Sequence, residues 1–480
     1  MKVWLAVKAI PPTRKYRVLL LLMILPAIVT GCYPAFEEHR PTDKRGFEDK
    51  PYYKKALAAI ERYKAHCSHS SIGDRFEAGW SARSITPPIG TPLAGYGARK
   101  GKPSMGVHDE LFVKALAVGD GLDTAVIVGA DMLIIPENIA GPVRTRVSQQ
   151  TPLTANEILF NASHNHSGPG AFAPGLASRI ANGPYDRKIC DLLTGAFTEA
   201  IVEAYRSLEP AKVTHGSVDA PEYIKNRTRR DGRVDSELSY MLIEQKDGDQ
   251  CFIISYSAHP TILGADNMQF SGEYPGVLMR RMMERTGAEA IYLGGAVGSM
   301  GPRPPERNEP FERCRAMGVA LADKVLDAVV DAPRFKDTVD VASIGFPIQL
   351  PPFHVRLSKH WRISKLLFPL LGIDTDGWMH AVRIGDVEFV GMPADYCGEI
   401  SVDLKSRVQN RLIDLWVLSF NGDYAGYISP DKYYYDKDEK GGYGYERGIM
   451  SWIGPDQEAF TVSLILHMID ALFPESRRNL

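Results

Sequence analysis

Two histidines one residue apart, His164 and His166, stand where an apolar run meets a turn. The run Ile158–Ala162 is followed by Ser-His-Asn-His and then by Ser-Gly-Pro-Gly. In an extended strand, residues two apart point to the same face, so both imidazoles are expected to project together. Converging neutral imidazoles suit Zn²⁺. The same pattern also fits two hydrogen-bonded histidines that cap a strand, so other parts of the chain have to supply the remaining ligands.

Three later apolar runs also deliver polar side chains at their ends. Cys251–Ser257 leads into His259, the predicted hairpin that ends at Val390 leads to Asp395, and Leu415–Phe420 leads to Tyr424 and Tyr427. Strand ends of an α/β protein are where sites tend to form. Two histidines, one carboxylate and a further oxygen ligand would together hold Zn²⁺ and a water molecule.

The elements that would position these residues alternate between strands and helices. Buried strands are expected at 79–86, 111–118, 124–135, 157–163, 212–218, 239–245, 251–257, 288–294, 339–350, 379–384, 387–390 and 415–420, and helices at 136–149, 186–208, 275–285, 311–330, 398–408 and 460–472. No internal repeat interrupts this order. We therefore predict a single large domain over residues 77–480, with a mixed, layered α/β fold in which helices cover the strands.

The N-terminus has the pattern of a lipoprotein signal peptide over residues 1–31. Basic residues precede the apolar stretch Val18–Thr30, and Gly31-Cys32 follows. Val-Thr-Gly-Cys resembles a bacterial lipobox, which would make Cys32 the acylated first residue; ordinary secretory cleavage and a retained anchor are the alternatives. Tyr33 after the cysteine favours the outer membrane. Residues 32–76 are polar and are predicted to be a spacer, with a short helix over 53–66.

The composition excludes several classes of function. The chain has 56 Lys and Arg against 58 Asp and Glu, so a nucleic-acid partner is not indicated. The six cysteines form no Cys-x-x-Cys pair, so a cysteine zinc or redox motif is not supported. An apolar content of 44% is ordinary for a globular protein with a substantial core.

Several motifs in order resemble the catalytic domain of the neutral/alkaline, non-lysosomal ceramidases. They are the segments 85–95, 106–111 and 163–170, Asn226-Arg227, Ser257-Ala-His259-Pro and Gly422-Asp-Tyr-Ala-Gly-Tyr427. The resemblance extends over about residues 78–470 and implies a mixed α/β fold that binds zinc and hydrolyses an amide. The chain ends near the end of that catalytic domain, so we expect no C-terminal immunoglobulin-like domain.

The resemblance also implies roles for particular residues. His164 and His259 match the family's two histidine ligands, Asp395 stands in the place of its glutamate ligand, and Tyr427, with Tyr424 as the alternative, matches its tyrosine ligand. Residues that would contact the substrate carbonyl or headgroup are His166, Arg227 and Tyr445. The resemblance thus divides the first pair of histidines into one ligand and one donor to the substrate.

Two departures from the family bear on the substrate. Asp395 is one methylene shorter than glutamate, and the family's Gly-Asp-x-x-Pro turn is Gly298-Ser-Met-Gly-Pro302 here. The predicted function is zinc-dependent release of a fatty acid from a ceramide-like lipid at a membrane surface of a bacterial cell envelope. The alternatives are a non-catalytic lipoprotein that binds through the same fold and a metal hydrolase for a different amide or ester.

Overall fold

Eight strands between Glu77 and Gly294 form one mixed sheet, and this sheet bends into two halves. The computed structural model describes residues 35–38, 46–66, 73–332, 334–358, 360–367, 371, 376–436 and 444–473. The bend lies between β2 and β7, which are joined only where Glu77 pairs with Pro210 and Ala78 with Glu209. In spatial order the strands are β12 (Glu289–Gly294), β10 (Gln250–Tyr256), β9 (Glu237–Gln245), β7 (Glu209–Asp219), β2 (Glu77–Ser84), β4 (Phe112–Gly119), β5 (Thr124–Ala130) and β6 (Ile158–Ala162).

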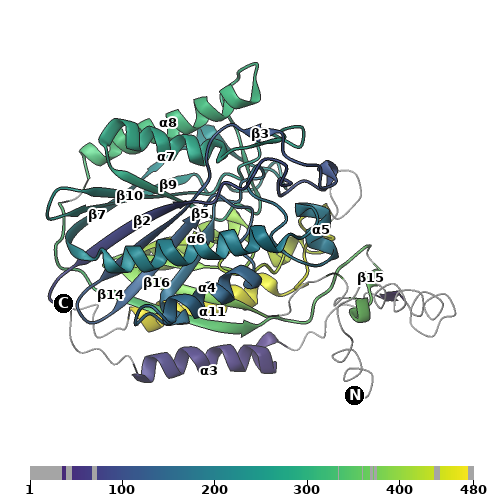
Figure 1. The fold of residues 1–480 in the computed structure, drawn as a ribbon. Helices are drawn as coiled ribbons and strands as arrows, with labels where there is room; N and C mark the ends of the chain where they lie inside the picture. Colours follow the sequence, from purple (N-terminus) through teal and green to yellow (C-terminus); the bar gives the residue numbers. More distant parts are fainter. Residues whose placement is uncertain are drawn as a thin grey trace.

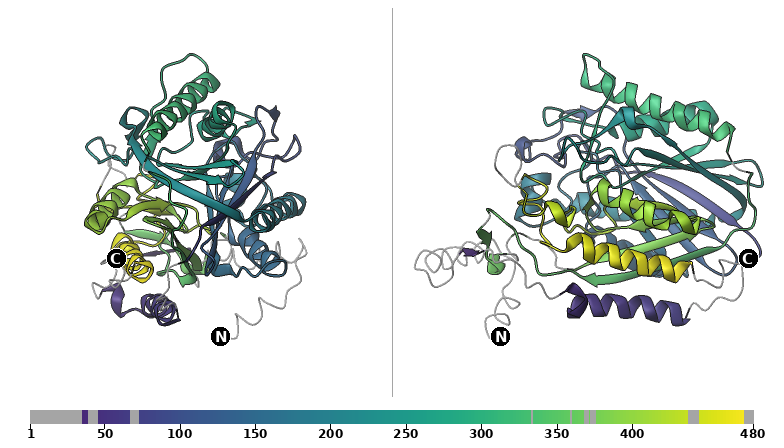
Figure 2. Two further views of the ribbon diagram at one scale, coloured as in Figure 1. Left: turned by 90° about the vertical axis from the view of Figure 1, so that its left-hand side faces the viewer. Right: turned by 180° about the vertical axis from the view of Figure 1, so that it is seen from behind.

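A second sheet of four strands lies against the concave side of the bend. Its order is β14 (Val341–Gln349), β16 (Asp376–Ile384), β17 (Val387–Gly391) and β19 (Asp414–Leu418). Side chains from this sheet and from both halves of the larger one meet in a single apolar core, which includes Leu116, Ile127, Ile253, Val382 and Trp416. The three sheet surfaces therefore enclose the centre of the domain, as the end-on view of Figure 2 shows.

Helices cover the outer face of each sheet surface (Figure 1). One half of the large sheet packs on α4 (Glu137–Ser148) and α6 (Arg187–Arg206), and the other half packs on α7 (Glu273–Thr286) and α8 (Pro310–Val330). The four-stranded sheet packs on α10 (Gly398–Val408) and α11 (Gln457–Leu472). The mixed α/β prediction of a single domain, with helices covering the strands, is confirmed.

Part of the segment that we predicted to be a spacer is a folded part of the domain. Helix α3 (Pro51–His66) packs against β14 and α11, and it buries Tyr53, Ala56 and Ile60 in the core beneath the four-stranded sheet. These three residues recur at helical spacing and form the buried apolar stripe of an amphipathic helix. The short helix is therefore confirmed, whereas the spacer prediction is wrong for residues 51–66.

Short strand pairs hold the loops at the ends of the main sheets. They are β18 (Asp395–Tyr396) with β20 (Tyr427–Ile428), β13 (Met300–Pro302) with β8 (Ile224–Asn226), β11 (Gln269–Phe270) with β3 (Gly106–Val107), and β1 (Phe36–Glu38) with β15 (Trp361–Ile363). A short helix, α5 (Leu176–Asn182), follows the histidine motif. The first pair contains Asp395 and Tyr427 of the predicted site, and Arg227 directly follows β8 of the second.

The next observations concern membrane-spanning helices, the N-terminus and the cysteines. Among the described residues, no helix combines the length and apolar character that crossing a bilayer requires. Residues 1–31 and Cys32 lie outside the described residues, so the signal peptide and the lipid anchor stay predictions. Cys190, Cys251, Cys314 and Cys397 are buried free thiols.

Candidate metal and catalytic site

Three imidazoles meet at one end of the central core. The Nε2 atom of His166 lies 3.3 Å from Nε2 of His164 and 3.0 Å from Nε2 of His259. His164 and His259 are buried and His166 is partly buried. The strand ends that carry them are brought together because β6 and β12 lie side by side, where Asn161 Oδ1 accepts a hydrogen bond from the Gly294 amide at 2.7 Å. The predicted convergence of His164 with His259 is therefore present.

The local conformation of the His-x-His motif differs from our prediction. Strand β6 ends at Ala162, and His164 has a φ of 61°, in the left-handed region that non-glycine residues seldom adopt. The two rings do not point the same way as in a strand but stand at 84° to each other. The Nε2 atoms still converge, because the chain turns between the two histidines and does not continue the strand.

The Nδ1 atoms distinguish the three histidines. Nδ1 of His164 lies 2.7 Å from the Leu133 carbonyl, and Nδ1 of His259 lies 3.4 Å from the Val297 carbonyl. Nδ1 of His166 is buried and has no hydrogen-bond partner among the described residues. A histidine that binds metal through Nε2 nearly always donates its Nδ1–H to a carbonyl or carboxylate. His164 and His259 have this arrangement and His166 does not.

The Leu133 carbonyl lies in a loop that begins where strand β5 ends, which is earlier than we predicted. We expected a strand over 124–135, but β5 stops at Ala130. The buried carboxylate of Asp131 accepts a hydrogen bond from the Phe112 amide at 3.0 Å, which fixes the chain where it leaves the sheet. The residues that follow form the loop beside His164.

Asp395 and two tyrosines complete the cluster. Asp395 pairs with Tyr427 in the parallel pair β18–β20, and its Oδ1 atom lies 3.4 Å from Nε2 of His164. The hydroxyl of Tyr424 donates to Asp395 Oδ2 at 2.6 Å. Burial raises the pKa of Asp395 to about 7, while the Tyr424 hydrogen bond and the charge of Arg227 oppose that rise.

The donor set fits a zinc ion. Tetrahedral zinc with bonds of about 2.0–2.1 Å places its ligand atoms about 3.4 Å apart. Asp395 Oδ1 lies 3.4 Å from Nε2 of His164, and a ring nitrogen of His259 lies within 4.8 Å of one of His164. Burial lowers the pKa of His164 to about 3 and those of His166 and His259 well below the ordinary value, so the imidazoles are neutral. Asp395 Oδ1 is fully buried and has no hydrogen-bond partner among the described residues. A cation among these atoms would offset the cost of that carboxylate.

The altered turn at Gly298 supports the strand that carries Asp395. A Cβ atom at Gly298 would lie 2.7 Å from the Asp395 carbonyl oxygen, so glycine allows the two backbones to approach. Ser299, which stands where the family has aspartate, accepts a hydrogen bond from the Gly398 amide at 3.2 Å. The serine thereby satisfies a backbone donor at the start of α10.

Arg227 and Tyr445 lie next to the cluster. Arg227 Nη2 donates to the Tyr427 hydroxyl at 3.0 Å and to the Gly298 carbonyl at 3.1 Å. Tyr445 is 58% exposed, and its ring centroid lies 5.9 Å from that of Tyr427. Burial of its hydroxyl raises the pKa of Tyr445 to about 12, so it is protonated at neutral pH. All seven predicted site residues in the described part of the chain therefore gather in one region.

Sequence reasoning missed three residues of this region. Glu446 lies 3.6 Å from Arg227 Nε, and the ring of Tyr96 lies 4.6 Å from that of His166. Buried Arg99 donates to the carbonyl of His166 at 2.6 Å and to that of Gly264 at 3.1 Å, and so ties the two histidine loops together. Two of these residues could have been found from the sequence, because Glu446 directly follows Tyr445 and Tyr96 lies in a glycine-rich loop. Nothing in the sequence near Arg99 predicted its role.

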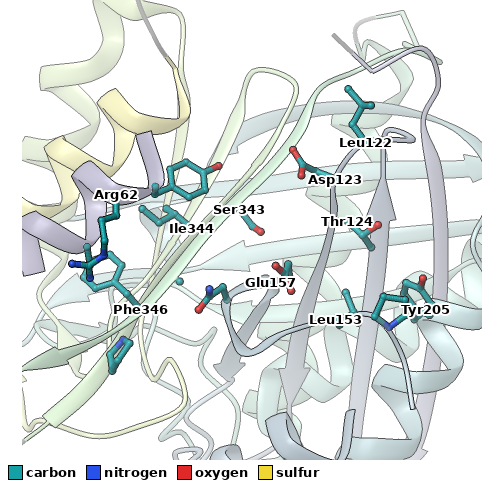
Figure 3. A pocket seen from close by; sticks show the side chains of 16 residues that line it. Arg62, Leu122, Asp123, Thr124, Leu153, Glu157, Tyr205, Ser343, Ile344 and Phe346 are labelled. Atoms are coloured by element: carbon teal, nitrogen blue, oxygen red, sulfur yellow. The ribbon is translucent and has the colours of Figure 1, made fainter. Parts of the chain in front are cut away.

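A large cavity lies apart from this site. Figure 3 shows it between α3, β14 and the turn that joins β4 to β5, with a volume of about 740 Å³. Its lining combines charged and apolar side chains, such as Arg62, Glu157, Leu153 and Phe346. None of the residues that line it belongs to the histidine cluster.

Comparisons with known proteins agree on the relationship. Residues 76–295 match the sequence model of the family described as neutral/alkaline non-lysosomal ceramidase, N-terminal. The chain is 24% identical over 230 residues to neutral ceramidase A of Dictyostelium discoideum, a match that covers 44% of this chain and 32% of that protein. It is 22% identical over 222 residues to neutral ceramidase of Mycobacterium tuberculosis, covering 42% of this chain and 34% of that one. The matched segments thus span about a third of the length of these relatives.

A solved structure shares the fold. The crystal structure of neutral ceramidase from Pseudomonas aeruginosa superimposes with a TM-score of 0.72 at 17% sequence identity, over 84% of this chain and 75% of that one. Residues 76–295 therefore match the sequence pattern of the neutral/alkaline non-lysosomal ceramidase family, and most of the chain shares the fold of a solved neutral ceramidase.

Proposed function

We propose that the chain is a zinc-dependent hydrolase that cleaves the amide bond of a ceramide-like N-acyl lipid and releases a fatty acid. The observation that carries this proposal is the approach of His164, His259 and Asp395, with both histidines oriented through Nδ1 in the way that ligands are. The phenol of Tyr427 or Tyr424 would supply a further oxygen ligand. Zinc held by these residues would activate a water molecule for attack on the amide carbon.

The remaining residues have the chemistry to stabilise the reacting amide. Because Nδ1 of His166 has no partner, its proton is favoured on Nε2, which faces the cluster and can donate to the amide oxygen. Arg227 supplies a fixed positive charge beside the same point, since it is held by Tyr427 and Gly298. Donors held in place where negative charge develops are usually the largest contribution to catalysis.

The departing amine needs a proton. Tyr445 is protonated at neutral pH and partly exposed, so its hydroxyl can reach a substrate that enters from solvent. His166 can serve the same purpose from inside the cluster. Either residue would act as a general acid in the second half of the reaction.

We also propose that the chain works at a membrane of a bacterial cell envelope, with Cys32 as the lipid attachment site. The lipobox-like sequence and the lipid nature of the proposed substrate support this location. Mass spectrometry of the mature N-terminus tests it, because acylation adds a defined mass to a peptide that starts at Cys32. An unmodified peptide that spans residues 31–33 would contradict it.

Metal content and product analysis test the activity. Protein purified without chelators should hold about one zinc per chain, and His164→Ala should not. His380→Ala is a matched control, because His380 is fully buried and bonded to Ala155 and Asn421 and is not among the three clustered histidines. Released fatty acid is then measured by mass spectrometry on a panel of N-acyl lipids and esters. Zinc without hydrolysis of any lipid would favour a binding protein, and hydrolysis of esters alone would favour a different hydrolase.

A further inference from the structure

The two-stranded sheet β1–β15 exposes two aromatic side chains on one face and carries an ion pair on the other. Glu37 pairs with Arg362 in the register, and the two side chains form a salt bridge at 3.0 Å with exposed fractions of 29% and 16%. Glu37 also accepts a hydrogen bond from Ser364 at 2.8 Å. Phe36 and Trp361 lie on the opposite face with Glu38 and Ile363, and each of the two aromatic side chains is 54% exposed. Glu38 is also exposed, whereas Ile363 packs partly against the core.

Two residues close to β15 in the sequence are also apolar and exposed. Leu357, which precedes β15, is 45% exposed, and Leu366, which follows it, is 61% exposed. Soluble monomers scatter such residues singly, so a group of them marks a contact surface. Tryptophan and phenylalanine beside basic residues are typical of side chains at the boundary between lipid and water. We call Phe36, Leu357, Trp361 and Leu366 the apolar face.

The segment before β15 is bonded to the loop that carries Tyr445. The buried Arg356 donates to the carbonyls of Tyr434 at 2.7 Å and Arg447 at 2.5 Å. The His354 amide donates to the Trp452 carbonyl at 2.5 Å. Figures 1 and 2 show β15 at the end of the molecule where α5 lies. The apolar face is thereby tied to the side of the domain from which Tyr445 is exposed.

The position of Phe36 in the chain identifies the occupant. Cys32 precedes it by four residues, so an acyl chain on Cys32 would be linked to β1 by at most about 14 Å of extended backbone. Such a lipid would bring the apolar face to a bilayer. We propose that the apolar face enters the interfacial layer of a lipid bilayer and directs the Tyr445 side of the site towards it. This inference rests on the proposed action on a membrane lipid.

Quenching of a fluorescent label by a lipid tests whether the apolar face enters the bilayer, and this measurement does not require enzymatic activity. Leu366→Cys and, as a matched control, Val330→Cys are labelled with a nitrobenzoxadiazole dye in the full chain, which is then bound to phosphatidylcholine vesicles. Val330 is 83% exposed at the end of α8, away from β15. A lipid carrying a nitroxide on its acyl chain should reduce the emission at 366 about twofold or more and leave that at 330 unchanged. Equal emission changes at both positions, or protection at 366 through self-association without vesicles, would overturn the proposal.

A kinetic comparison adds a second readout. Trp361→Asp with Leu366→Asp should lower the ratio of the rate on a vesicle-embedded lipid to that on a dispersed short-chain lipid by at least about tenfold, because the loss of a single apolar side chain from the lipid already has an effect of that size. The control is the double variant Val330→Asp with Leu412→Asp, since Leu412 is 86% exposed and does not belong to the apolar face. An unchanged ratio would contradict the proposal. If the unaltered chain hydrolyses no lipid, the proposed function fails, while the quenching result still decides the surface.

Discussion

Replacing His166 with alanine should abolish most of the activity and leave zinc bound. One ring nitrogen from each of the three histidines lies within 4.8 Å of the other two, so proximity alone would allow all three to be ligands. Hydrogen bonding separates them, because His164 and His259 are oriented by carbonyl oxygens and His166 is not. We therefore expect His166 to act as a donor to the substrate oxygen.

The magnitude follows from that role. Loss of one donor to a developing oxyanion lowers kcat by about 10²–10³, which corresponds to about 2.7–4 kcal/mol. Zinc affinity should fall by at most about tenfold to a hundredfold, the range for residues that support ligands without binding the metal. His164→Ala should instead lose both the zinc and the activity, since it removes a ligand.

Zinc per chain and kcat are measured together on His166→Ala, His164→Ala and the unaltered protein, each dialysed against the same zinc buffer. Unfolding curves establish that each variant is folded. The assignment is refuted if His166→Ala loses zinc as completely as His164→Ala does, because three histidines would then hold the metal. It is equally refuted if His166→Ala keeps both its zinc and its full kcat.

Four further predictions follow from the structure. Gly298→Ala should cost about 1–3 kcal/mol of stability and lower zinc content, because its Cβ would press on the Asp395 carbonyl; urea unfolding and metal analysis measure this. Glu446→Gln should raise KM about twofold to fivefold through a looser Arg227, as steady-state kinetics would show. Burial raises the pKa of Glu388 to about 8, so its contribution to stability is complete below about pH 4.5 and is lost as the pH rises through 8. Glu388→Gln should flatten that loss, which is on the order of 5 kcal/mol, in unfolding free energies measured across this range. Chelation should lower Tm by several degrees, since a ligand at a hundredfold excess over its Kd contributes about 2.7 kcal/mol.

Controls distinguish these effects from general damage. Gly195→Ala places a methyl group in open space in helix α6, so it should not destabilise the protein. A Glu388→Gln protein whose stability falls as steeply with pH as that of the unaltered chain would show that other groups control the pH dependence. An equal drop in Tm on chelation in His164→Ala would show that the chelator acts at another site.

Much of the fold could be predicted because apolar periodicity is strong in this chain. Helix α6 buries Ile189, Leu193, Phe197 and Ile201 at helical spacing, and our predicted range differs from the observed one by only one residue at its start and two at its end. Apolar runs likewise indicated the main strands. The bend of the large sheet could not be predicted, since it depends on how few pairs join β2 to β7, and this bend brings β6 beside β12.

The candidate site was found for a reason that holds only in part. Alternation along a strand predicted that His164 and His166 converge, yet β6 ends before them and His164 adopts a positive φ. Their rings meet because the chain turns and because Phe420 stacks on His164 with centroids 4.1 Å apart. Residue type and order therefore located the site, whereas the backbone conformation that forms it depends on contacts from distant parts of the chain.

The choice between Tyr424 and Tyr427 shows what the structure adds to the sequence. Three residues separate them after the same strand, so spacing cannot assign one to the metal. The structure gives them different partners: Tyr424 donates to Asp395 Oδ2, and Tyr427 accepts from Arg227. Burial raises the pKa of both phenols well above the ordinary value. The charge of Arg227 opposes that rise at Tyr427, whereas the Asp395 carboxylate and its hydrogen bond add to it at Tyr424. These bonds favour Tyr427 as the ligand and make Tyr424 the residue that turns Asp395 Oδ1 towards the histidines.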